Sequence, residues 1–219
     1  MLVLINGQPL TINWADRNIP SILEAWFPGQ LGGEAIAQTL FGDYNPGGRL
    51  SVTFPRSIGQ IEFNFPFKPG SQDGQYFEGP NGSGRTRVNG ALYPFGYGLS
   101  YTTFAYSNLS VKQETPYSQS PVTVTVDVTN TGKRAGDEVV QLYIRDKVSS
   151  VIAYESVLRG FERISLQPGE TKTVSFVLLP EDLQILDRHM EWTVEPGEFE
   201  VRIGASSNDI KLKETFVVK

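Results

Sequence analysis

Apolar and polar residues alternate with a period of two over most of the chain from about residue 101 onward. Such alternation is the pattern of strands that bury one face. Turn-forming groups separate the runs: Asn130-Thr131-Gly132, Gln167-Pro168-Gly169 and Glu195-Pro196-Gly197. The runs, of which the first and fourth are weaker, are residues 104–112, 122–128, 139–145, 157–165, 172–179, 198–204 and 214–218. Around seven short strands with regular turns predict an immunoglobulin-like β-sandwich, long enough to bury its own core.

The first 55 residues show a mixed pattern instead. Residues 2–5 (LVLI) form a continuous apolar run before an Asn-Gly turn, which is typical of a short buried strand. Apolar residues at helical spacing predict helices over 19–27 and 33–42, and Gly42 can cap the second. An alternating run over 49–54 follows. Strand, helix, helix and extended segment indicate part of an α/β domain, too small to fold alone reliably.

Between these two parts lies a stretch with little regular pattern. Residues 68–90 are rich in Gly, Asn, Ser and charge, and they predict a long exposed loop. We therefore expect three regions: the C-terminal part of an α/β sandwich domain (1–66), a long loop and linker (67–100), and a β-sandwich domain (101–219). The predicted fold class is mainly β, with a partial α/β segment in front of the sandwich.

Charge and composition exclude several function classes. The formal net charge is −5 and no run of Lys or Arg occurs, which argues against nucleic acid and against an anionic membrane surface. No stretch is long and apolar enough to span a bilayer, and the opening MLVLI is too short for a signal-peptide core. There is no Cys and one His, His189, so we expect neither a metal site nor a cofactor.

Several long strings resemble glycoside hydrolase family 3, and together they cover nearly the whole chain. They are LVLINGQPLTI (2–12), AWFPGQLGGEAIAQTLFGDYNPGGRLSVTFPRS (25–57), PFGYGLSYTTF (94–104), VTVDVTNTGKRAGDEVVQLYI (124–144) and EPGEFEVRIGASS (195–207). The first two are similar to the α/β sandwich domain of that family. The third resembles the hinge into its fibronectin type III-like domain, and the last two resemble strands of that domain.

The resemblance implies a β-glucosidase-like enzyme that hydrolyses terminal β-linked sugars of oligosaccharides or β-glucosides. Family members are similar in being retaining glycosidases, which need a nucleophile and an acid/base carboxylate about 5 Å apart. In the family the Asp nucleophile belongs to a preceding barrel domain, and the Glu acid/base lies just upstream of the strand that opens this chain. We therefore expect this chain alone to be inactive and carry over no catalytic residue. The resemblance also implies a periplasmic or secreted location.

Other carboxylates have simpler interpretations. Glu34 opens a helix, where a carboxylate favours the helix dipole, and Asp43 lies beside a turn. Asp73 and Glu78 lie in the long loop, where solvated charge is the default reading. His189, within DRHMEW (187–192), is expected in a turn between strands.

Aromatic residues are the candidates for sugar contact. Of Trp14, Trp26, Phe63, Phe65, Phe67, Tyr76 and Phe77, the loop residues Tyr76 and Phe77 are the best candidates, because aromatics in an exposed loop have no packing role. Trp26 at helical spacing is more often part of a core. We expect the loop 68–90 to reach over the mouth of the active site in an intact enzyme.

Two alternatives stay open at this point. The chain can be a stand-alone carbohydrate-binding or structural module, for which Tyr143, Tyr154 and Trp192 are the aromatics to test, although Tyr143 lies in an alternating strand and can point inward. It can also be a truncated product whose exposed apolar segment over residues 1–55 favours a homodimer or aggregation.

Overall fold

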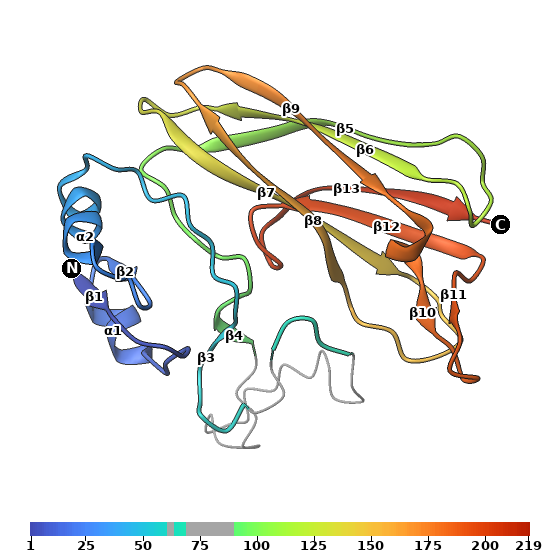
Figure 1. The fold of residues 1–219 in the computed structure, drawn as a ribbon, viewed down its shortest axis with the longest axis horizontal. Coiled ribbons are helices and arrows are strands. Elements are labelled where there is room, and N and C mark those ends of the chain that lie inside the picture. Colours follow the sequence, from blue (N-terminus) through green and yellow to red (C-terminus); the bar gives the residue numbers. More distant parts are fainter. Residues whose placement is uncertain (61–63, 69–89) are drawn as a thin grey trace, which may run out of the picture.

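The computed structural model describes residues 1–60, 64–68 and 90–219. The N-terminal α/β segment contains β1 (Leu2–Leu4), α1 (Asn13–Asn18), β2 (Ile22–Glu24) and α2 (Gly32–Phe41). It lies at one end of an elongated molecule, and the rest is a layered β-structure with the C-terminus at the far end (Figure 1). The predicted combination of an α/β segment and a mainly β fold is confirmed.

The helix predicted over residues 19–27 is wrong. Residues Ile22–Glu24 form β2, which pairs in parallel with β1 so that Leu2 lies opposite Ile22 and Leu4 opposite Glu24. Trp26 then has a positive φ of 50°, which no helix allows. The apolar positions at helical spacing are too few to separate a short buried strand from a helix, and pairing with β1 decides the outcome.

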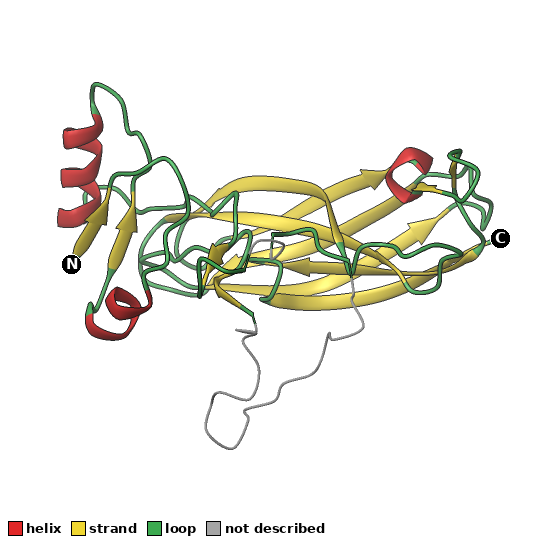
Figure 2. Ribbon diagram, turned by 90° about the horizontal axis from the view of Figure 1, so that it is seen from below, coloured by secondary structure: helices red, strands yellow, loops and turns green. Residues whose placement is uncertain are grey.

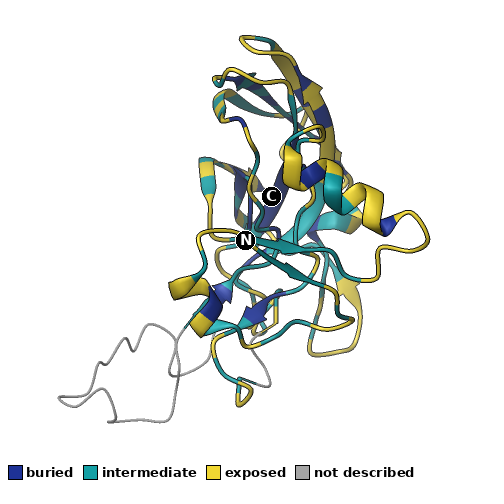
Figure 3. Cartoon of the chain, turned by 90° about the vertical axis from the view of Figure 1, so that its left-hand side faces the viewer, coloured by how far each residue is buried: buried dark blue, intermediate teal, exposed yellow. Residues whose placement is uncertain are grey.

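The second predicted helix is confirmed as α2, with nearly the predicted bounds. Gly42 ends it with a φ of 85°, the left-handed conformation that glycine adopts without a Cβ penalty. The helix presents much of its surface to solvent: Phe41 is 83% exposed. Figure 3 shows this exposed side of the α/β segment facing the viewer.

All seven strands predicted from the period of two are confirmed. They are β5 (Phe104–Gln113), β6 (Val122–Asn130), β7 (Gly136–Asp146), β8 (Val157–Leu166), β9 (Thr171–Leu178), β12 (Gly197–Gly204) and β13 (Ile210–Val218). Within residues 90–219 they form one sheet ordered β5-β6-β9 and another ordered β13-β12-β7-β8, all antiparallel. The two sheets pack face to face as a sandwich (Figure 2).

The sandwich core comes from the inward positions of both sheets. On β6, the four valines Val122, Val124, Val126 and Val128 are fully buried, while the residues between them are partly exposed. They meet a facing layer from β7 and β12 that includes Leu142 and Ile203. Tyr143 is also fully buried, as the alternation of β7 allows, so it is not a surface aromatic.

Short elements complete the structure. They are β3 (Phe54–Pro55), β4 (Ala91–Tyr93), the 3-10 helix η1 (Pro180–Leu183), β10 (Ile185–Leu186) and β11 (Trp192–Thr193). β3 pairs with β4 beside the α/β segment, and β10 pairs with β11 at the opposite end of the sandwich (Figure 1). No helix among the described residues is long and apolar enough to cross a membrane.

Candidate functional site

A groove at the end of the sandwich remote from β1 and α2 is the candidate functional site. Its volume is about 850 Å³. The ends of β7, β8 and β12 form the floor, and η1, β10 and β11 form one wall. The opposite wall is the connection between β7 and β8, residues 147–156, together with Lys68. Segments far apart in the sequence therefore build one concave surface.

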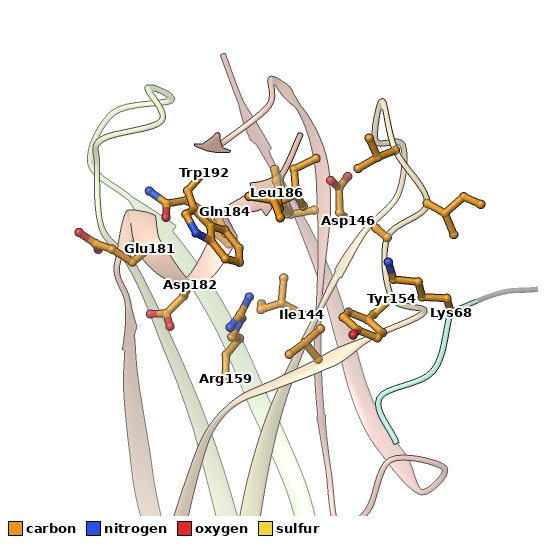
Figure 4. A pocket seen from close by; sticks show the side chains of 17 residues that line it. Lys68, Ile144, Asp146, Tyr154, Arg159, Glu181, Asp182, Gln184, Leu186 and Trp192 are labelled. Carbon is orange, nitrogen blue, oxygen red and sulfur yellow. The ribbon is translucent and has the colours of Figure 1, made fainter. Parts of the chain in front are cut away.

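Aromatic side chains stand on both walls. Trp192 begins β11 and is 68% exposed, and Tyr154 on the opposite wall is 43% exposed. Lys68 Nζ lies 5.3 Å from the centroid of the Tyr154 ring, a cation–π contact. Figure 4 shows Trp192 on one side, Tyr154 and Lys68 on the other, and Arg159 with Ile144 between them.

Hydrogen bonds fix the two walls. The Ser150 backbone N–H donates to Glu195 over 2.8 Å, which joins the 147–156 connection to the segment after β11. The Glu155 backbone N–H donates to the Phe67 carbonyl oxygen over 3.0 Å. On the other wall the Asp187 carboxylate accepts the backbone N–H groups of His189 and Glu191. The predicted turn over residues 187–192 is confirmed, and it positions Trp192.

The polar groups of the groove carry both signs of charge. Arg159 projects into the middle of the groove, and burial lowers the pKa of its guanidinium, an effect that nearby Asp182 opposes. Burial also raises the pKa of the Asp146 carboxyl, although the Val148 N–H donates to it. Partial burial, which disfavours the charged form, is the largest cause of both shifts. The groove can therefore offer hydrogen-bond donors and acceptors beside apolar and aromatic surface.

A second functional feature is the contact that holds the α/β segment on the sandwich. Arg49 forms an ion pair with Glu138 of β7 over 2.9 Å, and the two side chains are 7% and 3% exposed. The Tyr106 hydroxyl donates to the other carboxylate oxygen over 3.0 Å. Burial, helped by Glu138, strongly raises the pKa of Tyr106, so it stays a donor. This cluster fixes the orientation of the two parts.

Asn45 extends the same contact from the turn after α2. Its amide donates to the Ala135 carbonyl oxygen over 3.1 Å, and its side-chain oxygen accepts from the Ser100 hydroxyl and the Tyr101 N–H. Gln141 of β7 likewise donates to the carbonyl oxygens of Gly96 and Ala205. The segment from 42 to 55 and the segment from 93 to 102 are thus bound to the same sheet.

Two of the carboxylates that the sequence singled out, Glu34 and Asp43, lie in the described part of the chain. Glu34 accepts a hydrogen bond from Gln38 over 3.1 Å on the surface of α2, and Asp43 is exposed. Among residues 1–60, 64–68 and 90–219, no group of three or more His, Cys, Asp or Glu side chains is arranged to hold a metal ion. The carboxylate of Glu34 is thus engaged within its own helix, and that of Asp43 lies at the surface.

Most of the predicted aromatic candidates fall into three groups. Tyr76 and Phe77, with Phe63, Asp73 and Glu78, lie outside the described residues. Trp26 packs on Phe54 with ring centroids 5.9 Å apart, and Phe65 stacks on Phe95 at 4.6 Å, so both have packing roles. Trp192 and Tyr154 line the groove.

Arg159, Asp182 and Gln184 also line the groove, and sequence reasoning missed them. They follow no motif, because their proximity arises only when β8 and η1 meet in the fold. The sequence feature that could have pointed to the groove was Trp192 at the end of the turn over residues 187–192.

Comparisons with known proteins agree on one family. The model of the glycosyl hydrolase family 3 C-terminal domain matches residues 1–101, and the model of the fibronectin type III-like domain matches residues 138–207. A β-xylosidase of Formosa agariphila is 48% identical over 97% of this chain, and a periplasmic β-glucosidase of Salmonella typhimurium is 45% identical over 96%. The chain spans only 29% and 28% of the length of these two relatives.

Solved structures lead to the same result. A β-glucosidase from Erythrobacter marinus superposes with a TM-score of 0.87 at 39% identity, and a Listeria innocua β-glucosidase in complex with laminaribiose with a TM-score of 0.86 at 33%. Both cover 99% of this chain, which covers 28% and 30% of theirs. The chain belongs to glycoside hydrolase family 3 and corresponds to the C-terminal part of its members, an α/β segment followed by a fibronectin type III-like sandwich.

Proposed function

We propose that this chain is the non-catalytic C-terminal part of a retaining glycosidase that removes terminal β-linked glucose or xylose from oligosaccharides or β-glucosides. The observation that carries the proposal is the 48% and 45% identity to a β-xylosidase and a β-glucosidase over 97% and 96% of the chain. Such identity spans both the α/β segment and the sandwich. Both relatives are named as glycosidases, so the shared reaction class is hydrolysis of a glycosidic bond.

Within this enzyme, the sandwich holds the α/β segment of the chain in a fixed position. Arg49 and Glu138 form a buried ion pair between the α/β segment and β7, and Asn45 adds hydrogen bonds beside it. A catalytic group has to be held within a fraction of an ångström, and rigid elements do this better than loops. A sandwich with a closed core supplies such a support.

We assign both catalytic carboxylates to the part of the enzyme that precedes this chain. A retaining mechanism needs two carboxyl groups about 5 Å apart, one as nucleophile and one as acid/base. Glu34 is engaged with Gln38, and Asp137 and Glu138 are engaged with Arg163 and Arg49. These contacts support structural roles.

An assay of the purified 219-residue chain tests this assignment. With 4-nitrophenyl β-glucoside and β-xyloside as substrates, release of nitrophenol should equal that of a blank preparation. The intact Salmonella typhimurium relative serves as the positive control. A reproducible rate that disappears in Glu34→Gln or Asp43→Asn would contradict the assignment.

The regions 1–66, 67–100 and 101–219 are proposed as the end of the α/β domain, the loop and linker, and the sandwich domain. Tyr76 and Phe77 are proposed to contact substrate from the loop of the intact enzyme. Replacing each with Ala in the intact enzyme should lower kcat/KM by about two- to tenfold, the size of one lost aromatic contact. Unchanged kcat/KM for every substrate tested would refute this role.

Location and assembly are the last parts of the proposal. A periplasmic or secreted location is supported by the name of the Salmonella typhimurium relative. A homodimer through the α/β segment is supported by its exposed apolar side chains, Phe27 at 77% and Phe41 at 83%. Sedimentation velocity at several concentrations tests the homodimer, since a mass that stays monomeric throughout would exclude it.

A further inference from the structure

The groove walled by Trp192 and Tyr154 has no role in the proposed reaction. We propose that it binds a neutral, β-linked oligosaccharide without hydrolysing it. The inference goes beyond the proposed function, because binding at this groove requires no catalytic carboxylate. It rests on the geometry of the two walls, the polar groups between them and the charges that line the groove.

The aromatic walls match the apolar faces of sugar rings. A β-linked glucose or xylose unit presents C–H groups on its two faces and hydroxyl groups around its edge. Trp192 is 68% exposed and Tyr154 is 43% exposed, so neither ring is buried in the core. They stand on opposite walls of a groove of about 850 Å³, which is large enough for several sugar units.

Polar groups between the walls are available for the hydroxyl groups. The side chains of Arg159 and Gln184 line the groove and make no hydrogen bond or ion pair to another residue in the described part of the chain. Arg159 offers several N–H donors, and Gln184 offers both a donor and an acceptor. A sugar hydroxyl can donate and accept, so it satisfies both kinds of group at once.

The charges at the groove favour a neutral ligand. Among the described residues, Asp146, Glu181 and Asp182 line it against Lys68 and Arg159, so carboxylates outnumber cations there. An acidic sugar or a phosphate would meet three negative side chains. A neutral polyol avoids this repulsion and still uses acceptors and donors. The cation–π contact of Lys68 with Tyr154 and the Ser150–Glu195 hydrogen bond hold the walls in place. Binding therefore costs little conformational entropy for ordering the walls.

Titration of the 219-residue chain with cellotetraose and xylotetraose, followed by calorimetry and tryptophan fluorescence, tests the proposal. We expect saturable binding of at least one of them. Trp192→Ala should weaken it by about fivefold, since loss of an aromatic contact removes on the order of 1 kcal/mol. Trp14→Ala is the matched control, because Trp14 is 67% exposed but lies in α1 of the α/β segment; it should leave the affinity unchanged.

A second variant distinguishes a loss of binding from a folding defect. Tyr154→Ala removes the opposite wall without touching β11, and it should weaken binding as well. Both variants should retain the thermal unfolding midpoint of the unchanged chain. Three outcomes would each overturn the proposal. They are absence of binding with both sugars, equal affinity of Trp192→Ala and the unchanged chain, and an equal loss of affinity in Trp14→Ala.

Competition experiments separate the other possible occupants. Polygalacturonate tetramer, an acidic sugar, should bind more weakly than cellotetraose. A proline-rich peptide that binds the groove while both neutral sugars fail would reassign it to a protein partner. The titrations measure binding and not turnover. A chain that binds no sugar would therefore not contradict the hydrolase proposal. In the same way, a failed hydrolase assay would not contradict binding at the groove.

Discussion

Arg49 brings a positive charge into a site where its side chain is only 7% exposed, and Glu138 compensates it there. Removing one partner of a buried pair leaves the other charge without compensation. We expect Arg49→Met to lower the free energy of unfolding by about 3–5 kcal/mol. Urea denaturation measures this loss.

The control for Arg49 is an exposed ion pair. Lys211 and Asp209 are 39% and 53% exposed at 2.7 Å, so Lys211→Met should cost at most about 1 kcal/mol. The double variant Arg49→Met with Glu138→Gln should recover part of the loss, because no buried charge remains. Equal losses for Arg49→Met and Lys211→Met would contradict the role given to the buried pair.

Asp137, next along β7, predicts a dependence of stability on pH. Partial burial raises the pKa of its carboxyl, but the hydrogen bonds from Ser165 and Arg163 outweigh this and lower the pKa below its usual value. The carboxylate therefore stabilises the fold above its unfolded pKa of about 3.9, and this contribution is lost as the pH falls through the lower folded pKa.

Asp137→Asn should remove that contribution. Between about pH 5 and pH 2, the free energy of unfolding should then fall less steeply than in the unchanged chain. Urea denaturation across this range measures the slope. Asp43→Asn is the control, because Asp43 is exposed and makes no hydrogen bond or ion pair to a described residue. If both variants keep the slope of the unchanged chain, Asp137 is not the group responsible.

At the scale of single elements, β9 offers an internal comparison of buried and exposed valine. Val174 is 1% exposed and faces the core, whereas Val177 on the same strand is 58% exposed. Val174→Ala should cost about 2 kcal/mol of unfolding free energy, from lost burial and the cavity left behind. Val177→Ala should stay within about 0.5 kcal/mol. Similar costs at both positions would contradict the assignment of Val174 to the core and of Val177 to the surface.

The seven sandwich strands could be predicted because each buries one face. On β6 the valines at every second position have no other arrangement that hides them all. The α/β segment gave one correct helix and one wrong one. α2 has ten residues and a glycine cap, whereas β2 has three residues and depends on its neighbour β1. Short elements are set by tertiary pairing, which a local pattern does not contain.

At the scale of the whole molecule, the candidate site was largely beyond the reach of sequence. Trp192 and Tyr154 could be named as aromatics to test, but not as two walls of one groove. Arg159, Gln184 and Lys68 meet there only because β8, η1 and the segment before residue 69 converge. Family resemblance supplied the reaction class, and packing supplied the position of the groove.

The two parts of the molecule should differ in local stability. The α/β segment has a two-stranded sheet and large exposed apolar side chains, while the sandwich has a closed core. Amide hydrogen exchange should therefore be faster in β1 and β2 than in β6 and β7 by at least about a hundredfold. Equal protection throughout would show that the α/β segment folds as firmly as the sandwich.

The most direct measurement joins this chain to the rest of a family 3 enzyme. The matching C-terminal part of the Salmonella typhimurium periplasmic β-glucosidase, 45% identical, would be replaced by residues 1–219, and hydrolysis of 4-nitrophenyl β-glucoside would be measured. We predict that the folded chimera hydrolyses this substrate and that the chain alone does not. Arg49→Met should lower the hydrolysis rate of the chimera. A folded chimera without activity, or a chain that is active alone, would contradict the account.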